Sequence, residues 1–146
     1  MEEKITQLIQ SLNIMFWGCF LSSILTGIFL ILIEYNTIDE QLSVNLQSAA
    51  ILILLGCVPL ALWLYRKKLI SETLPDDEDQ RITLIRKWFI VRLALVEFAF
   101  LFNIVVYVLT KNSSFLFCCG IALMIFLFLC RPKRDEIVHI LSKNNL

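Results

Sequence analysis

Glu97 is the residue of this chain whose type and position could do chemistry, because it lies inside the apolar stretch RLALVEFAFLF, residues 92–102. An acid within a hydrocarbon layer costs free energy, so it serves either as a carrier of a proton or ion or as a hydrogen-bonding group that holds helices together. Burial disfavours the charged form of a carboxyl group. We therefore expect Glu97 to be protonated and to donate a hydrogen bond, with the backbone carbonyl of Leu55 and the hydroxyl of Ser23 as the leading acceptors.

Other reactive residue types give weaker signals. The five cysteines include no C-x-x-C pair, and we interpret them as small apolar fillers of the helices. Glu136 and His139 have the spacing that di-iron bundles use twice, but His139 is the only histidine. No nucleophile elbow, Gly-rich phosphate loop or zinc signature is present, so we expect no metal, no cofactor and no enzymatic activity.

The composition is typical of a membrane protein. The chain of 146 residues is 58% hydrophobic and 18% charged, with a mean hydropathy of +0.77, whereas soluble domains are roughly 45–50% apolar and about 25% charged. Four apolar segments come close to the length of about 20 residues that crosses a bilayer as a helix. They cover residues 14–33, 46–65, 88–110 and 113–130.

These segments predict the fold class. A backbone in lipid must satisfy its own hydrogen bonds, and no barrel-like alternation of side chains is present. We therefore expect an all-α protein: a single membrane domain over residues 1–146, built as an integral membrane four-helix bundle in up-down-up-down order.

The basic residues predict the orientation. Eleven lysines and arginines lie in the N-terminal segment, the second loop and the C-terminal tail, whereas the two remaining loops hold one, Lys111. Because loops rich in Lys and Arg stay in the cytoplasm, both termini are expected on the cytoplasmic side of the cell (inner) membrane. No basic stripe with interleaved aromatics is present, so no nucleic-acid partner is expected.

The second loop contains an acidic cluster, in SETLPDDEDQRITLIRK, residues 71–87. Thr73 and Asp76 have the spacing of a capping box, and Pro75 fits a first helical turn. The third helix is therefore expected to begin near residue 74 and to project from the membrane. The projecting part is a candidate docking surface, and a solvated charged face is the alternative.

The C-terminal tail, residues 132–146, combines a basic group with an apolar side. Arg131, Lys133 and Arg134 lie at the expected membrane surface, where they could hold anionic lipid. Pro132 is expected to end the fourth helix, and the tail is expected to lie along the inner interface as an amphipathic helix. Its apolar side consists of Ile137, Ile140 and Leu141.

Small residues follow the first apolar segment in two neighbouring rows, Gly18–Ser22–Thr26 and Cys19–Ser23–Gly27. Such a face lets transmembrane helices approach closely. It serves either self-association or packing inside the same bundle, and we leave both open.

Helix depth connects this face to Glu97. Counting nine residues from the expected cytoplasmic end of each span places Ser23, Gly56 and Glu97 at one level, with Gly120 alongside. Pro59 cannot donate an amide hydrogen bond, which frees the Leu55 carbonyl near the same level. We expect these small residues and Pro59 to be helix-packing residues at the level of Glu97.

Two further polar residues lie in the third segment. Arg92 precedes Glu97 by five residues, about 140° around a helix, so an ion pair between them is geometrically poor. We expect Arg92 to extend toward the inner interface instead. Asn103, together with Gln10 and Asn13, could line a polar path, although these residues occupy different depths and faces.

The stretch LVEFAFLFNIVVYVL, residues 95–109, resembles the carboxylate helix of rotary ATPase proteolipids, which implies a proton- or ion-carrying role for Glu97. The chain departs from that family in its 22-residue second loop and in lacking an acid in the first hairpin. The whole layout, with an arginine-proline pair and an amphipathic tail after the last span, resembles small four-span proteins of bacterial membranes. That resemblance implies no activity.

Together these features predict a non-catalytic polytopic membrane protein that sits in the lipid bilayer and acts by assembly with itself or with a larger membrane partner. The alternative is a small proton- or ion-coupled transporter or channel that uses Glu97.

Overall fold

The computed structural model describes residues 2–33, 40–71, 75 and 77–142. Within these residues the chain is helical, without strands. The α-helices are α1 (Glu2–Leu32), α2 (Glu40–Arg66), α3 (Glu78–Thr110), α4 (Ser114–Leu129) and α5 (Arg134–Ser142), and a π-helical turn, η1 (Lys67–Ser71), follows α2. The predicted all-helical fold class is confirmed.

The ends of α3 are set by local hydrogen bonds. Asp77 is the N-cap, and its carboxylate accepts a hydrogen bond of 3.2 Å from the backbone N–H of Asp79. At the other end Lys111 has a left-handed conformation, with φ 53°, and its N–H donates to the Tyr107 carbonyl. The helix thus begins at Glu78, four residues after the predicted start, because Asp77 provides the cap. The proposed capping pair, Thr73 and Asp76, lies outside the described residues.

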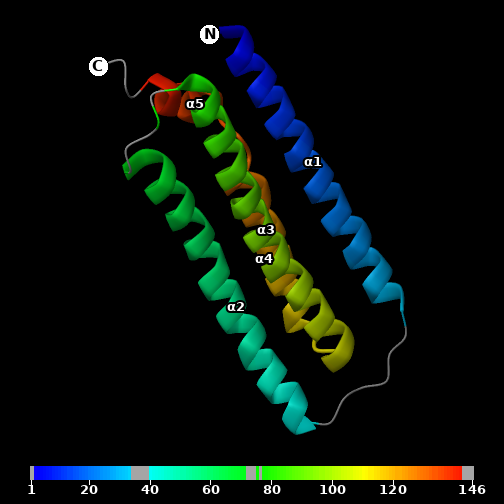
Figure 1. Cartoon of the computed structure of the whole chain (residues 1–146). Helices are drawn as coiled ribbons and strands as arrows, with labels where there is room; N and C mark the ends of the chain where they lie inside the picture. Colours follow the sequence, from blue (N-terminus) through cyan, green and yellow to red (C-terminus); the bar gives the residue numbers. More distant parts are fainter. Residues whose placement is uncertain (1, 34–39, 72–74, 76, 143–146) are drawn as a thin grey trace.

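Helix α3 occupies the centre of the bundle. Consecutive long helices run in opposite directions, and α1, α2 and α4 all pack against α3, with α4 behind it in Figure 1. Half of the most apolar window of α3 is buried (50%), compared with 17% for α1 and 22% for α2. The arrangement is therefore three helices around a central one.

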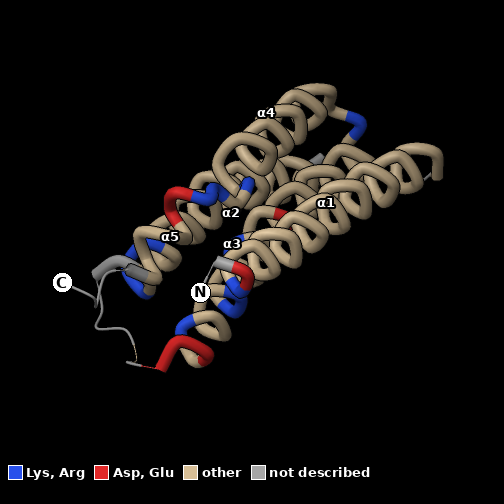
Figure 2. The backbone as a smooth tube through the Cα atoms, turned by 90° about the horizontal axis from the view of Figure 1, so that it is seen from above, with Lys and Arg blue, Asp and Glu red and all other residues tan. Residues whose placement is uncertain are grey.

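Charged residues gather at one end of the molecule. The start of α1, η1, the first turns of α3, and α5 all lie at this end, which we call the charged end (Figures 1 and 2). The middle of the bundle carries few charges, and Lys111 lies at the opposite end. The asymmetry of the sequence is thus an asymmetry of the folded molecule.

The largest hydrophobic core lies at the charged end. It is built from every long helix and from α5, and its buried members include Leu8, Phe16, Tyr65, Leu69, Ile85, Phe89, Phe126, Ile137 and Ile140. Two smaller clusters lie further along the bundle, around Phe100 with Cys119 and around Ala50 with Phe115. The core that fixes the helices together is therefore concentrated where the chain is most polar.

The tail differs from its prediction. Ile137, Ile140 and Leu141 form the apolar side of α5, as expected, but they are buried in the main core. Because α5 folds back against α1 and α3, protein rather than a lipid interface covers this side. The basic residues Arg131, Lys133 and Arg134 all remain exposed.

Three helices, α1, α2 and α3, are long and apolar enough to cross a membrane. Helix α4 has 16 residues, and it reaches such a length only together with α5, across a bend of 54°. The chain is therefore a helical bundle with three or four candidate spans. Helices α1 and α2 both begin before the apolar segments that predicted them, at Glu2 and Glu40.

Gly27 gives a test of the close contact between α1 and α3. A Cβ atom at this position would lie 2.6 Å from Ile104 Cδ1 and 3.4 Å from Phe100 Cζ, whereas one at Gly18 would meet nothing within 4 Å. Gly27→Leu should therefore overpack the interface and lower the free energy of unfolding by about 1–3 kcal/mol. Gly56→Leu, at a glycine on α2 where an added Cβ also meets nothing within 4 Å, is the matched control and should leave it unchanged. Thermal unfolding in detergent measures both, and equal midpoints for the two variants would contradict this packing.

Candidate functional site

Glu97 and Ser23 form a polar contact between α3 and α1. Ser23 Oγ lies 3.1 Å from Glu97 Oε1, within hydrogen-bond distance. Ser23 is buried, with 1% of its surface exposed, and Glu97 is half-buried. The structure thus brings together Glu97 and one of its two expected partners. Among the described residues no hydrogen bond joins Glu97 to the other candidate, Leu55, whose side chain points outward.

The Ser23 hydroxyl group has one proton but lies close to two oxygen atoms. Ser23 Oγ also lies 2.8 Å from the carbonyl oxygen of Cys19, to which it can donate. A hydroxyl group has one proton, so it cannot donate fully to both oxygens. If the Ser23 hydroxyl donates its proton to the Cys19 carbonyl, that proton is not available for Glu97. Ser23 and Glu97 then form a hydrogen bond only when the Glu97 carboxyl group is protonated and donates to Ser23 Oγ. The geometry accommodates a neutral Glu97 with both interactions satisfied.

The two rows of small residues on α1 have different surroundings. Ser23 and Gly27 are buried against α3, whereas Gly18 and Ser22 are exposed and Thr26 is half-buried. Neighbouring residues of a helix point about 100° apart, so only one of the two rows can face α3. The inner row packs within the bundle, and most of the outer row is left on the surface.

The small residues expected around Glu97 on the other helices also face outward. A Cβ atom at Gly56 or Gly120 would meet nothing within 4 Å, and Pro59 is exposed. These three residues therefore do not contact Glu97 within the described chain. Counting residues from the end of a span gives the depth of a residue but not the direction in which its side chain points from the helix axis. On these two helices that direction is outward, toward the surface.

Arg92 is buried at the meeting point of three helices. It is 3% exposed, and its Nη2 donates a hydrogen bond of 3.0 Å to the Cys130 carbonyl at the end of α4. The guanidinium carbon lies 4.0 Å from the centroid of the Tyr65 ring and 5.2 Å from that of Phe89. Its Nε has no hydrogen-bond partner among the described residues. Arg92 thus extends toward the charged end of the bundle, where the end of α4 and Tyr65 cover its guanidinium group.

Asn103 links α3 to α2. It is completely buried, and its Nδ2 donates to the carbonyl of Ala99, at 2.8 Å, and to that of Ala50, at 3.4 Å. It follows Glu97 by six residues, which places it about 120° away around the helix. Gln10 is exposed on α1. The polar residues that could line a path therefore do not converge on Glu97.

Arg81 is a structural residue that the sequence reading missed. Its Nε donates a hydrogen bond of 2.6 Å to the Pro75 carbonyl, and its Nη1 donates one of 2.9 Å to the Leu141 carbonyl in α5. Arg81 is buried in a row of α3 residues with helical spacing that continues through Ile85, Phe89 and Arg92. This spacing was the available signal, since a residue in an otherwise apolar row is expected to face the core.

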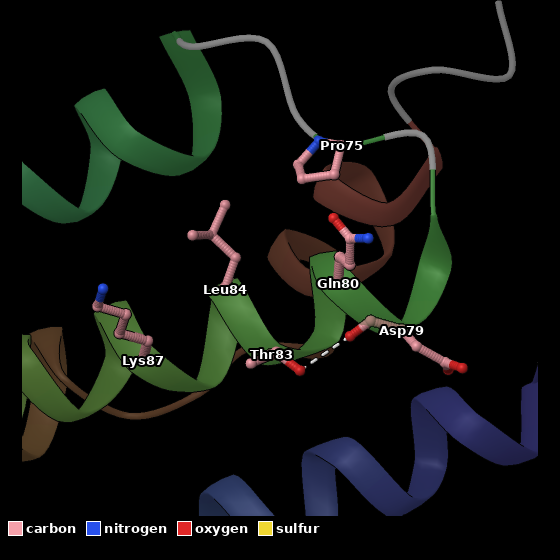
Figure 3. Close-up of a pocket in the computed structure, with 6 residues that line it drawn as sticks. All are labelled: Pro75, Asp79, Gln80, Thr83, Leu84 and Lys87. Carbon is pink, nitrogen blue, oxygen red and sulfur yellow. Dashed lines mark hydrogen bonds between the residues drawn. The ribbon is translucent and has the colours of Figure 1, made fainter.

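The first turns of α3 carry a shallow open hollow of about 470 Å³ (Figure 3). Its lining combines Pro75, Asp79, Gln80, Thr83, Leu84 and Lys87. Thr83 Oγ1 already donates to the Asp79 carbonyl, and the Asp79 carboxylate accepts a hydrogen bond of 2.9 Å from Lys4 on α1. The expected docking surface on this part of α3 is thus partly engaged with α1, which favours the alternative of a solvated charged face.

Comparison of the chain with known protein families, characterised proteins and solved structures gives no match. The assignment of function therefore depends on the contacts and surfaces described above.

Arg92 provides a test of how a buried cation is held. Arg92→Lys keeps the charge but loses the planar group that lies over Tyr65 and the fork of donors that reaches Cys130. Arg92→Met removes the charge and keeps an apolar side chain of suitable length, which often restores or raises stability. We expect Arg92→Lys to be the less stable variant by at least about 1 kcal/mol in detergent unfolding. A lysine variant as stable as the methionine variant would contradict a role for ring stacking.

Proposed function

We propose that the protein is a four-span protein of the cell (inner) membrane, with both ends of its chain in the cytoplasm, that acts without catalysis by assembling with itself or with a larger membrane partner. The observation that carries the assembly proposal is the outer row of α1, where Gly18 and Ser22 are exposed within an apolar segment. Small residues on a lipid-exposed surface allow another helix to approach closely.

The orientation is supported by the charged end. Lys4 at the start of α1 lies there together with two groups of basic residues, from the η1–α3 region and from the α4–α5 junction. Lysine and arginine near the ends of spans are retained in the cytoplasm. In this orientation the large core extends from the cytoplasmic ends of the helices into the expected spans, where Phe16, Ala61 and Phe126 lie.

The carrier alternative for Glu97 has less support. A carrier acid must exchange its proton or ion with water through a polar path. The hollow between α1, α3 and α4 has a volume of about 240 Å³, is lined mainly by apolar residues, among them Ile24, Phe100 and Ile104, and is lined by neither Ser23 nor Glu97. Glu97 is better explained as the acid of a structural hydrogen bond between α1 and α3.

The orientation can be tested by cysteine labelling in a variant without the five native cysteines. Ser113 and Lys133 are both exposed and lie at opposite ends of α4. In intact cells a membrane-impermeant thiol reagent should label Ser113→Cys and leave Lys133→Cys unlabelled until the membrane is opened. The reverse pattern would overturn the orientation.

Glu97→Gln decides between assembly and ion transport. A neutral amide can replace a protonated carboxyl group as a hydrogen-bond donor to Ser23, so the variant should keep the fold and the same complex in mild detergent extracts of native membranes. Glu97→Lys is the disruptive control, because it buries an unpaired charge.

If the wild type carries a proton or sodium current in proteoliposomes, and Glu97→Gln abolishes this current with its fold intact, Glu97 is a carrier. A wild type that runs as a single uncomplexed chain would contradict assembly.

A further inference from the structure

One side of α3 is left open between α1 and α2. Ile90, Ala94, Phe98 and Val105 are all exposed although they lie in the apolar part of the helix. Their spacing of four, four and seven residues places them on one side. Helices α1 and α2 flank α3, and α4 lies behind it (Figure 1). We call these four residues the open strip of α3.

Glu97 lies at the edge of the open strip. It comes directly before Phe98 and is half-buried, so part of its carboxyl group is accessible. Among the described residues its one hydrogen bond, through Oε1, is with Ser23. A carboxyl group can make further hydrogen bonds through its second oxygen. In hydrocarbon no water can form a hydrogen bond with this second oxygen. A donor from another protein would therefore form a hydrogen bond that the single chain lacks.

Ser22 lies on the flank of α1 that borders the open strip. It points about 100° to one side of Ser23, and Ile24, which points equally far to the other side, lines the hollow toward α4. Ser22 therefore faces away from α4. Because Ser23 contacts Glu97 and each residue rises 1.5 Å, Ser22 is nearly level with Glu97.

The Ser22 hydroxyl is an unused donor. The hydroxyls of Ser23, Ser48, Thr83 and Thr110 each bond the backbone carbonyl four residues earlier. No such bond, and no other hydrogen bond to Ser22 Oγ, is found within the described part of the chain. Ser11 and Thr26 on the same helix also form no such bond within the described residues, but Ser22 is the exposed one of the three and is nearly level with Glu97.

From these positions we propose that a second copy of this chain docks on the open strip of α3, with Ser22 of each copy donating a hydrogen bond to Glu97 of the other. The chain supplies both a spare donor and a spare acceptor at one depth. A two-fold axis along the membrane normal keeps each residue at its depth, so the two bonds form reciprocally. A different partner would have to bring its own donor to Glu97. This inference rests on the proposed assembly and specifies its partner and its face.

Disulfide cross-linking between two differently tagged copies tests the face. Both copies lack the native cysteines; one carries Ser22→Cys and the other Ala94→Cys. Mild oxidation in native membranes should give a dimer that contains both tags. The control pair replaces Ala94→Cys with Gly120→Cys, an exposed position on α4 near the same depth, and should give no such dimer.

A second test measures the dissociation constant of the dimer in the protein that keeps its native cysteines. Ser22→Ala removes the donor from an exposed position, so the monomer should unfold as the wild type does. The dissociation constant of the dimer in detergent should rise roughly 10- to 300-fold, because the dimer loses two interhelical hydrogen bonds, each of which contributes a factor of about 3 to 18. Leu21→Ala is the control, since Leu21 is exposed on the far side of α1.

The outcomes separate the two proposals. A tagged dimer through Ser22 and Ala94, weakened by Ser22→Ala, supports the open strip. A dimer that cross-links through Gly120 or through neither pair, or a complex with a different protein alone, overturns the open strip and leaves assembly intact. A chain that is monomeric in native membranes, without any partner, overturns both.

Discussion

Arg92 is a buried cation without an ion pair among the described residues, and its contacts join three helices of the bundle. A buried charge is stable only when dipoles or other groups replace the water it has lost. Here the carbonyl of Cys130 contributes the negative end of the α4 dipole, and the rings of Tyr65 and Phe89 present their faces. Since each group comes from a different part of the chain, satisfying Arg92 fixes α2 and the end of α4 on α3.

The remainder of the bundle is held by contacts of two kinds. At the charged end a core of large side chains is closed by α5, and Arg81 ties this helix to α3 through the Leu141 carbonyl. Along the apolar part the helices are joined by individual polar contacts, Ser23 with Glu97 and Asn103 with Ala50, and by the close approach of Gly27 to Ile104. Contacts of this kind are typical of helices in lipid, because lipid is as apolar as the side chains and no hydrophobic effect drives such helices together.

Much of this arrangement could be predicted from the sequence. Apolar length identified α1, α2 and α3 as long helices and located the shorter α4, and counting residues placed Ser23 at the level of Glu97. Rotation about the helix axes could not be obtained in the same way, because Gly56 and Gly120 look alike whether they face a neighbour or lipid. The roles of Arg81 and Arg92 were missed for a different reason. Arg81 donates a hydrogen bond to a carbonyl 60 residues away, and Arg92 to one 38 residues away. The sequence does not show which distant carbonyls lie close enough to accept such bonds.

The hydrogen bond between Arg81 and Leu141 also bears on the order in which the molecule is completed. A chain folds as it is synthesised, from its N-terminal end onward. Helix α5 is made after α1 and α3, yet Ile137 and Ile140 fill the same core as Leu8 and Phe16 from the first helix. Until α5 has been made, the side chains of α1 and α3 at the charged end have no cover from it, and Arg81 has no Leu141 carbonyl to bind. Helix α5 thus closes this core, and a chain cut before it would leave the core open.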